Sequence, residues 1–403
     1  MKLIRWFFSG EVLFSGFLVG YLLTTVTGGF IVFSHIFMIL SFMSFLKRLY
    51  NKKGILNINF IPFILYVLIF MVMLTSLYHT PLVISGQEKV FLFSTITAWT
   101  FFGTFLLIED KDSLKKLFQG MVFYAFLVSL FTVLSMLGGV EGRVGLGGGS
   151  DNVISVARIS GLGIISVVGL FFLQWTKGYK KLIGVVLLFL LIFSLFGTAS
   201  RGPLIALAIS LVIFIPLAFR FSLKELSITY NKGIVSLFLL FGAIVTFLTS
   251  FIKRGYFDTM LDRVNALRLE SAVWGRTTRF EAAAGMFSES PILGKGIGSF
   301  SYFYRSSEII DYPHNIFLEL SSELGLFGLF LFLVLLTYSF LCFFRYFKTN
   351  RLNEYQIVIF ISVIYLLINA NVSGDINGNR LLFAFLALMV MTPRFSETDD
   401  TVQ

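Results

Sequence analysis

Arginines and a histidine are the side chains in this sequence whose types and spacing could carry chemistry. Arg201 stands in the short polar interruption "GTASRGP" between two apolar runs, and Arg276 and Arg279 lie three residues apart in "GRTTRFEAAAG". His314 follows a proline in "DYPHNIFLELSSELG". A guanidinium stays charged and matches phosphate oxygens with its planar fork, while a histidine can accept a proton near neutral pH. The combination suits a reaction in which a hydroxyl loses its proton and a phosphorylated group leaves.

Each of these residues also has a structural interpretation that the sequence leaves open. Arg201 could reach toward lipid headgroups. The two loop arginines could form a solvated face or pair with Glu281. His314 could cap a helix or lie in the membrane interface.

Four further charged residues are candidates for supporting roles. Glu319 and Glu323 are four residues apart, so they fall on one side of the helix that begins after the histidine. We interpret them as partners of neighbouring arginines that orient this helix. Asp375 and Arg380, in "NVSGDINGNR", either pair with each other or join the site.

Composition places these residues in a membrane protein. Of the 403 residues, 57% are hydrophobic and only 13% are charged, whereas soluble domains have about 25% charged residues. The apolar runs have the length that a helix needs to cross a bilayer, about 20 residues. We therefore predict an all-α polytopic protein with about twelve spans in a single transmembrane domain, residues 1–403. The predicted spans cover residues 12–28, 30–46, 60–77, 90–108, 117–137, 153–175, 182–198, 203–219, 233–252, 315–344, 355–371 and 379–392.

The basic loops predict the orientation of the spans. With the N-terminus in the cytoplasm, "KRLYNKKG", "EDKDSLKK" and "TKGYKK" all fall on the cytoplasmic side, as the positive-inside rule requires. This asymmetry accounts for the net charge of +10, so we predict no nucleic-acid partner. The one long loop, residues 253–314 between the ninth and tenth spans, then lies outside, and residues 393–403 form a short disordered cytoplasmic tail.

The long outer loop contains predicted helices and a glycine-rich turn. "FDTMLDRVNALRLES" is amphipathic and suits a surface helix, and "GRTTRFEAAAGMFSES" predicts a second helix that Pro291 ends. The glycine-rich stretches 145–151 and 294–298 do not join a strand to a helix, so they are not nucleotide-binding loops. We interpret both as flexible outer turns.

The topology places every candidate residue on the outer face and leaves the middles of most spans without charge. A secondary transporter would concentrate ionisable groups near the membrane midplane, and it stays open as an alternative. No carboxylate cluster requires a metal, and the single cysteine, Cys342, cannot form an intramolecular disulfide. We expect neither a metal nor a cofactor.

Three motifs of the C-terminal half together resemble a known family. "TASRGPLIAL", "GRTTRFEAAAGMFSESPILGKGIGSF" and "PHNIFLELSSELGLFGL" follow one another in the order and spacing of the bacterial O-antigen ligase/polymerase superfamily. The sequence looks like an O-antigen polymerase-like integral membrane protein. The resemblance covers residues 198 to 330 and implies a GT-C-type glycosyltransferase of the bacterial cytoplasmic (inner) membrane, active on the periplasmic side. Such enzymes take a glycan on undecaprenyl pyrophosphate as donor.

The resemblance also implies roles for the candidate residues. The family's arginines, which correspond to Arg201 and Arg276 with Arg279 as an addition, bind the donor's pyrophosphate. The family's histidine corresponds to His314 and acts as general base toward the acceptor hydroxyl. No second carboxylate is placed to act as a nucleophile, so we expect inversion at the anomeric carbon.

Polymerase and ligase motifs overlap, so the acceptor stays open. A polymerase joins lipid-linked repeat units into O-antigen, capsular or exopolysaccharide, and a ligase hands the glycan to lipid A core. "HNIFLELSSELGLFG" favours the polymerase. A chain-length regulator and a flippase are then the expected protein partners.

Overall fold

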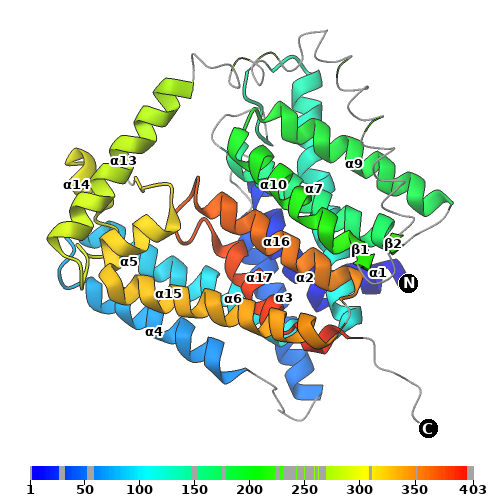
Figure 1. Ribbon diagram of the computed structural model, residues 1–403, viewed down its shortest axis with the longest axis horizontal. Coiled ribbons are helices and arrows are strands. Elements are labelled where there is room, and N and C mark those ends of the chain that lie inside the picture. The colour runs from blue at the N-terminus through cyan, green and yellow to red at the C-terminus, as the bar shows by residue number, and fades with distance from the viewer. Residues whose placement is uncertain are drawn as a thin grey trace.

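The computed structural model is a helical bundle with one small β-hairpin (Figure 1). The structure describes residues 2–26, 32–51, 59–140, 142–146, 152–174, 178–222, 227–230, 269–307, 311–350 and 352–396, and the single positions 242, 249, 258 and 262. The predicted ninth span, 233–252, and most of the predicted surface helix that starts at Phe257 lie outside these residues.

The helices follow the apolar runs of the sequence. In the N-terminal half they are α1 Lys2–Phe7, α2 Gly10–Val19 with the 3-10 segment Gly20–Thr25, α3 Phe33–Asn51, α4 Phe60–Ser76, α5 Val83–Leu92, α6 Ala98–Leu107 and α7 Lys111–Leu137. In the C-terminal half they are α8 Val153–Val167, α9 Tyr179–Gly197, α10 Arg201–Ala218, α13 Leu269–Glu289, α14 Phe300–Arg305, α15 Ile316–Thr349, α16 Glu354–Ala370 and α17 Arg380–Val390. The π-helical segments Phe93–Thr97 and Val168–Leu173 continue the helix before each of them.

Five helices of the described part are long and apolar enough to cross a membrane. They are Val83–Leu107, Lys111–Leu137, Val153–Leu173, Tyr179–Gly197 and Ile316–Thr349. Shorter apolar helices cover Gly10–Thr25, Phe60–Ser76, Arg201–Phe214, Glu354–Ala370 and Arg380–Val390. Large apolar side chains on α3 and α15, such as Met43 and Phe330, are exposed, as lipid contact requires and a soluble surface rarely allows. The number of spans and the placement of the long loop stay predictions.

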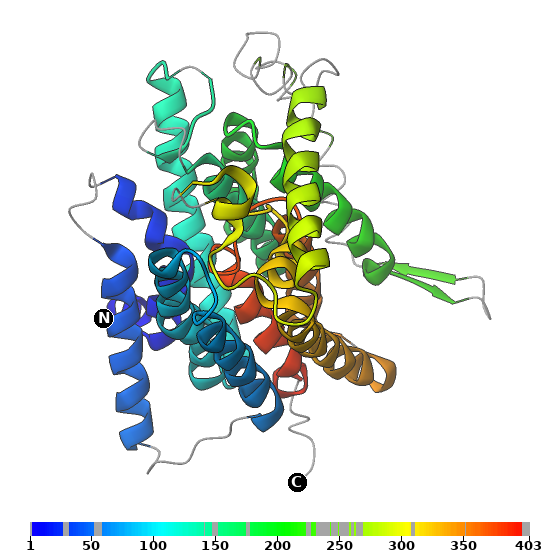
Figure 2. The same ribbon diagram turned by 90° about the vertical axis from the view of Figure 1, so that its left-hand side faces the viewer.

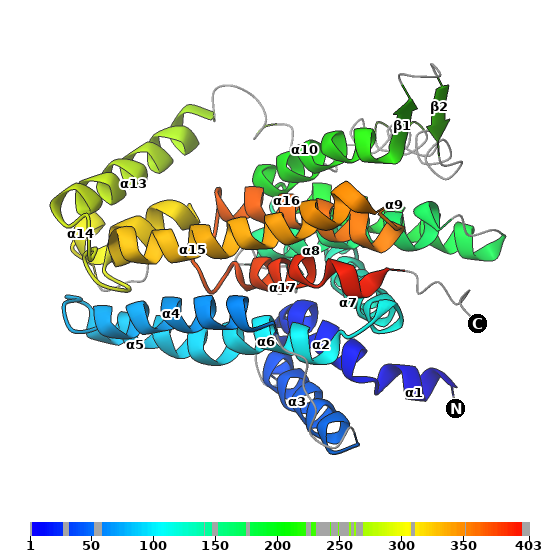
Figure 3. The ribbon, with the colours of Figure 1, turned by 60° about the horizontal axis from the view of Figure 1, so that its bottom comes forward.

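Helix α17 lies at the centre of the bundle, between α16 and α6 (Figures 1 and 3). Its residues from Leu382 to Val390 are all buried. The long helix α15 lies beside α4 in both views and also contacts α17. Because α17 is apolar all round, it needs neighbours on every side.

Local sequence sets where several helices begin. Asp110 and Ser113 form a capping box at the start of α7, and Asn353 and Gln356 form another at the start of α16. These side chains bind the backbone N–H groups that the first turn of a helix leaves without partners.

Helix α15 is interrupted at Gly325, whose backbone leaves the helical conformation with φ 65°. A Cβ atom at this position would lie 2.3 Å from the carbonyl oxygen of Ile292, so only glycine allows the two backbones to approach this closely. The sequence predicted one uninterrupted span, 315–344. The break separates a short N-terminal piece, which carries both candidate glutamates, from the long apolar remainder.

The all-α prediction misses one feature, a two-stranded antiparallel hairpin after α10. Strands β1 Phe219–Ser222 and β2 Ser227–Tyr230 pair in the register Phe219 with Tyr230. Figure 2 shows the hairpin projecting away from the helices. It begins at the last residue of the predicted eighth span, 203–219, and ends before the predicted ninth span, 233–252.

Candidate active site

The segments that carry the predicted site residues meet at one end of the bundle. They are the start of α10, the helix α13, residues 311–315 ahead of α15, and the loop 371–379 between α16 and α17. Asn315 Nδ2 donates a hydrogen bond to Asn371 Oδ1 at 3.1 Å, which ties the histidine segment to this loop. The loop 371–379 is therefore the common neighbour of the other segments.

Arg276 and the segment that begins with Arg201 both lie beside Val372 of this loop. Arg276 Nη2 donates to the carbonyl oxygen of Val372 at 3.3 Å. Val372 also packs on Gly202, where an added Cβ would be 3.1 Å from its Cγ2. Arg276 keeps an exposed surface, yet the protein around its guanidinium and the positive charge of Arg201 lower its pKa. Two like charges this close favour an anion between them.

Arg279 is engaged inside the protein. Its Nε and Nη2 donate to the two carboxylate oxygens of Asp311 at 3.3 and 3.0 Å, and its Nη1 donates to the carbonyl oxygen of Gly275 at 2.8 Å. The guanidinium also lies over the ring of Tyr304, 5.1 Å from the centroid. A bidentate pair of this kind fixes both side chains, so Arg279 fastens α13 to the segment that ends in His314.

His314 adopts a left-handed backbone conformation, φ 60°, directly after Pro313. Its ring stands edge-on to Tyr312 with the centroids 4.7 Å apart, and its buried Nδ1 has no hydrogen-bond partner. Burial and the charge of Arg279 lower the pKa of His314 to about 4. This is below the near-neutral value expected from the sequence, and the imidazole is neutral at pH 7.

The helix-capping role that the sequence left open for His314 belongs to Asn315. Its Oδ1 accepts hydrogen bonds from the backbone N–H groups of Phe317 and Leu318 at 3.0 and 3.1 Å. Asn315 is therefore the N-cap of α15. His314 stands one residue outside the helix, and capping does not explain its place.

Glu319 and Glu323 bind a lysine, which corrects the prediction that they hold arginines. Lys89 Nζ, on α5, lies 2.7 Å from Glu319 Oε1 and 2.9 Å from Glu323 Oε2. The predicted fourth span, 90–108, begins one residue after this lysine. A basic residue at the edge of an apolar run was the available signal.

The glycine stretch 294–298 is a buried turn and not a flexible one. The backbone N–H of Gly296 donates to the carbonyl oxygen of Glu323 at 2.9 Å, and that of Gly298 donates to Glu323 Oε2, also at 2.9 Å. Gly294, Gly296 and Gly298 all have positive φ. The turn is therefore held by α15.

The segment that carries these arginines and the histidine is similar to a known protein family. Residues 185–333 match the family model described as O-antigen ligase. This match covers part of the chain and supports its similarity to the O-antigen ligase/polymerase superfamily. The matched segment contains Arg201, Arg276, Arg279 and His314 together. No curated protein matches the chain.

The match to the O-antigen ligase family model, with the long apolar helices, indicates a membrane protein that processes lipid-linked glycans. Three residues outside the matched segment nevertheless contact it or belong to the loop beside it. Lys89 binds the glutamates of α15, Asp375 lies in the loop 371–379, and Arg380 follows that loop directly.

Asp375 and Arg380 do not pair with each other. Asp375 Oδ1 accepts from the backbone N–H of Gly378 at 2.7 Å and so shapes the loop. Arg380 lies over the ring of Tyr21, 4.4 Å from its centroid. No ion pair joins the two among the residues that the structure describes.

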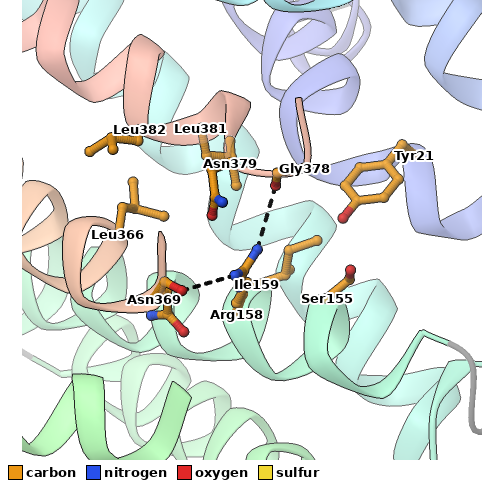
Figure 4. Close-up of a pocket in the computed structure, with 10 residues that line it drawn as sticks. All are labelled: Tyr21, Ser155, Arg158, Ile159, Leu366, Asn369, Gly378, Asn379, Leu381 and Leu382. Carbon is orange, nitrogen blue, oxygen red and sulfur yellow. Dashed lines mark hydrogen bonds between the residues drawn. The ribbon is translucent and has the colours of Figure 1, made fainter. Parts of the chain in front are cut away.

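Arg158 is a buried charge that was not among the predicted site residues, although it stands inside the apolar run "VISVARISGLG". Its Nη2 donates to the carbonyl oxygens of Asn369 and Ser373, and its Nη1 to that of Gly378. Figure 4 shows this guanidinium between the end of α16 and the start of α17, in a pocket that Tyr21 also lines. Arg158 thus holds the loop 371–379 from the side of the bundle.

Proposed function

We propose that this protein is a membrane glycosyltransferase that polymerises undecaprenyl-pyrophosphate-linked repeat units on the outer face of the cytoplasmic membrane. One observation carries the proposal: Arg201, Arg276 and His314 come from three separate segments and meet around the loop 371–379. Two cations beside a neutral imidazole match the needs of a reaction with an anionic leaving group and a hydroxyl nucleophile.

In the proposed reaction a glycosyl group passes from the donor diphosphate to the acceptor hydroxyl. The acceptor hydroxyl oxygen attacks the anomeric carbon of the donor sugar, and the bond from that carbon to the diphosphate oxygen breaks. The hydroxyl proton passes to a ring nitrogen of His314, whose imidazole is neutral at pH 7. The bond electrons leave with the diphosphate, whose growing charge Arg201 and Arg276 offset. A single displacement of this kind inverts the anomeric carbon.

The order of binding follows from the charges around the histidine. With no anion bound, Arg279 and Arg276 both disfavour a proton on His314, and its pKa is about 4. A diphosphate on the arginines offsets this positive field, which raises the proton affinity of the imidazole. The base therefore becomes stronger once the donor is in place. Arg279 acts in this scheme by holding Asp311 and the histidine segment.

The alternative within the same chemistry is a ligase that transfers the glycan to lipid A core. The description of the matching family, O-antigen ligase, favours it. The two differ only in the acceptor. A transporter or flippase of lipid-linked sugars would need free charges inside the bundle, but Lys89 and Arg158 are both bonded within the protein.

Reconstitution with defined lipids tests the proposal. The purified protein in liposomes is given an undecaprenyl-pyrophosphate-linked repeat unit, alone or with lipid A core. A ladder of lengthened lipid-linked chains supports the polymerase, glycan on lipid A core supports the ligase, and movement of the lipid across the bilayer without any new glycosidic bond supports the flippase. His79→Ala is the matched control for His314→Ala, because His79 is exposed after α4.

A further inference from the structure

Three buried charges meet beneath the histidine segment. Lys89 is 4% exposed, Glu319 1% and Glu323 0%. Lys89 Nζ donates to Glu319 Oε1 at 2.7 Å and to both oxygens of Glu323 at 3.0 and 2.9 Å. A lysine with all of its bonds directed to two carboxylates is a fixed junction between α5 and α15.

The junction also holds the glycine turn. Glu323 Oε2 accepts from the backbone N–H of Gly298 at 2.9 Å, and its Oε1 accepts from that of Phe300 at 3.3 Å. An added Cβ at Gly294 would lie 2.4 Å from the carbonyl carbon of Glu323. The turn and α15 therefore meet backbone to backbone, with no side chain between them.

A third connection reaches the loop 371–379. Asn377 Nδ2 donates to the carbonyl oxygen of Lys89 at 3.0 Å, and Thr97 Oγ1 donates to Asn377 Oδ1 at 2.8 Å. The same loop accepts Arg276 at Val372. Lys89 thus contacts α15, which follows His314, and the loop 371–379 directly. It contacts the glycine turn after α13 through Glu323.

Fold stability alone does not explain this arrangement. Removing ions from water costs several kcal/mol each, and apolar residues of similar volume often stabilise a core as well or better. Charges in such a place can instead specify one geometry, because only one arrangement satisfies them.

We propose that Lys89, with Glu319 and Glu323, is a positioning cluster that sets His314 against the arginines of α13. This inference rests on the proposed function. The cluster does not touch the substrate. It fixes the glycine turn that follows α13 and the helix that follows the histidine. Both segments then keep one position relative to the loop 371–379.

Replacement of the lysine tests the inference. In Lys89→Met the junction loses its charge, and we expect kcat to fall by roughly 10²-fold, the effect of a shift of about 1 Å at a reacting centre, while the KM for the donor changes little. Lys89→Arg keeps the charge and recovers part of kcat. As His314 moves away from the arginines, the acid limb of kcat/KM shifts upward in Lys89→Met, which a loss of stability alone would not produce.

The control is a partly buried ion pair at the opposite end of the helix Val83–Leu107, in which the side chain of Glu11 is 3% exposed and that of Arg48 27%. Glu11 pairs with Arg48 at 2.8 Å, and Arg48 also donates to the carbonyl oxygen of Leu107. Glu11→Gln breaks a comparable pair far from the site and should leave kcat and the acid limb unchanged. If Lys89→Met does not accumulate, Glu323→Gln keeps the shape of the side chain and gives the same measurements.

The outcomes separate this inference from the proposed function. Loss of transfer in His314→Ala together with wild-type kcat in folded Lys89→Met overturns the positioning role alone. A fall in kcat that follows the fall in melting temperature equally in Lys89→Met and Glu11→Gln also overturns it. Full activity in His314→Ala overturns the proposed function itself.

Discussion

Arg276 of α13 donates a hydrogen bond to the carbonyl oxygen of Val372, at 3.3 Å, and so joins the helix before the glycine turn to the loop between α16 and α17. The two residues are 96 positions apart in the chain. This contact brings a guanidinium of one segment to the place where Arg201 begins α10. The proposed diphosphate site depends on this proximity.

Removing either arginine should weaken donor binding. Each charge-assisted hydrogen bond contributes about 1.5–3 kcal/mol, so Arg201→Ala and Arg276→Ala should each raise the Kd for undecaprenyl pyrophosphate by roughly tenfold or more. Lysine at either place restores binding only in part, since a point charge does not replace the planar fork. Titration of the detergent-purified protein with the lipid measures the change. Arg345→Ala, an exposed arginine at the far end of α15, is the control. Unchanged binding in both site variants would argue against the diphosphate site.

The pH dependence of the reaction should reflect the low pKa of His314. The imidazole must be neutral to accept a proton, and with a pKa of about 4 it stays neutral as the pH falls to about 5 and becomes protonated below that. The acid limb of kcat/KM, which reports the free enzyme, should therefore lie near pH 4 and not near the ordinary value of about 6.5. Because bound diphosphate raises the proton affinity of the His314 imidazole, the acid limb of kcat should lie at a higher pH than that of kcat/KM. An acid limb at the ordinary value in both profiles would contradict this environment for the histidine.

The pair of Arg279 and Asp311 should act on turnover more than on donor binding. Arg279→Ala and Asp311→Asn each release the segment that ends in His314, so we expect kcat to fall by roughly tenfold or more. Since both changes break the same contact, the double variant should lose little beyond either single one. Single-turnover rates at saturating donor measure this. Additive losses would mean that the two residues act separately, as they would if Arg279 bound the donor directly.

Glycine should be required in the buried turn. At Gly296 an added Cβ would lie 2.6 Å from Thr80 Cα, and at Gly298 it would lie 2.7 Å from Gly86 N, both with positive φ. Gly296→Ala and Gly298→Ala should therefore lower the melting temperature and the activity. Gly285, within α13, has open space around its Cβ position, and Gly285→Ala should stabilise that helix by about 0.5–1 kcal/mol. Thermal unfolding in detergent compares the three. A melting temperature no lower in either turn variant than in the control would show that the turn tolerates a side chain.

Much of the architecture follows from the apolar runs, because helix is what a run of about 20 such residues forms in a membrane. Within the described residues, eleven of the predicted spans coincide with helices. The break at Gly325 was not predictable from the run itself, because it depends on the backbone of Ile292 approaching from a different segment. The residues around Gly325 do not indicate that the backbone of Ile292 lies against it.

The candidate site was predictable in its residue types and not in its pairings. Arginines and a histidine in a polar segment are visible in the sequence. The partner of the two glutamates was not, since Lys89 and Glu319 are 230 positions apart and no local pattern encodes such a contact. The same holds for the glycine turn, whose burial comes from α15 and not from its own residues.

The most direct measurement is the extension of a lipid-linked repeat unit by purified His314→Ala in liposomes, beside the wild-type protein and the His79→Ala control. We predict that the wild type and the control produce lengthened chains and that His314→Ala binds the donor with wild-type affinity but forms no new glycosidic bond. Full-length chains from a folded His314→Ala protein would contradict the account.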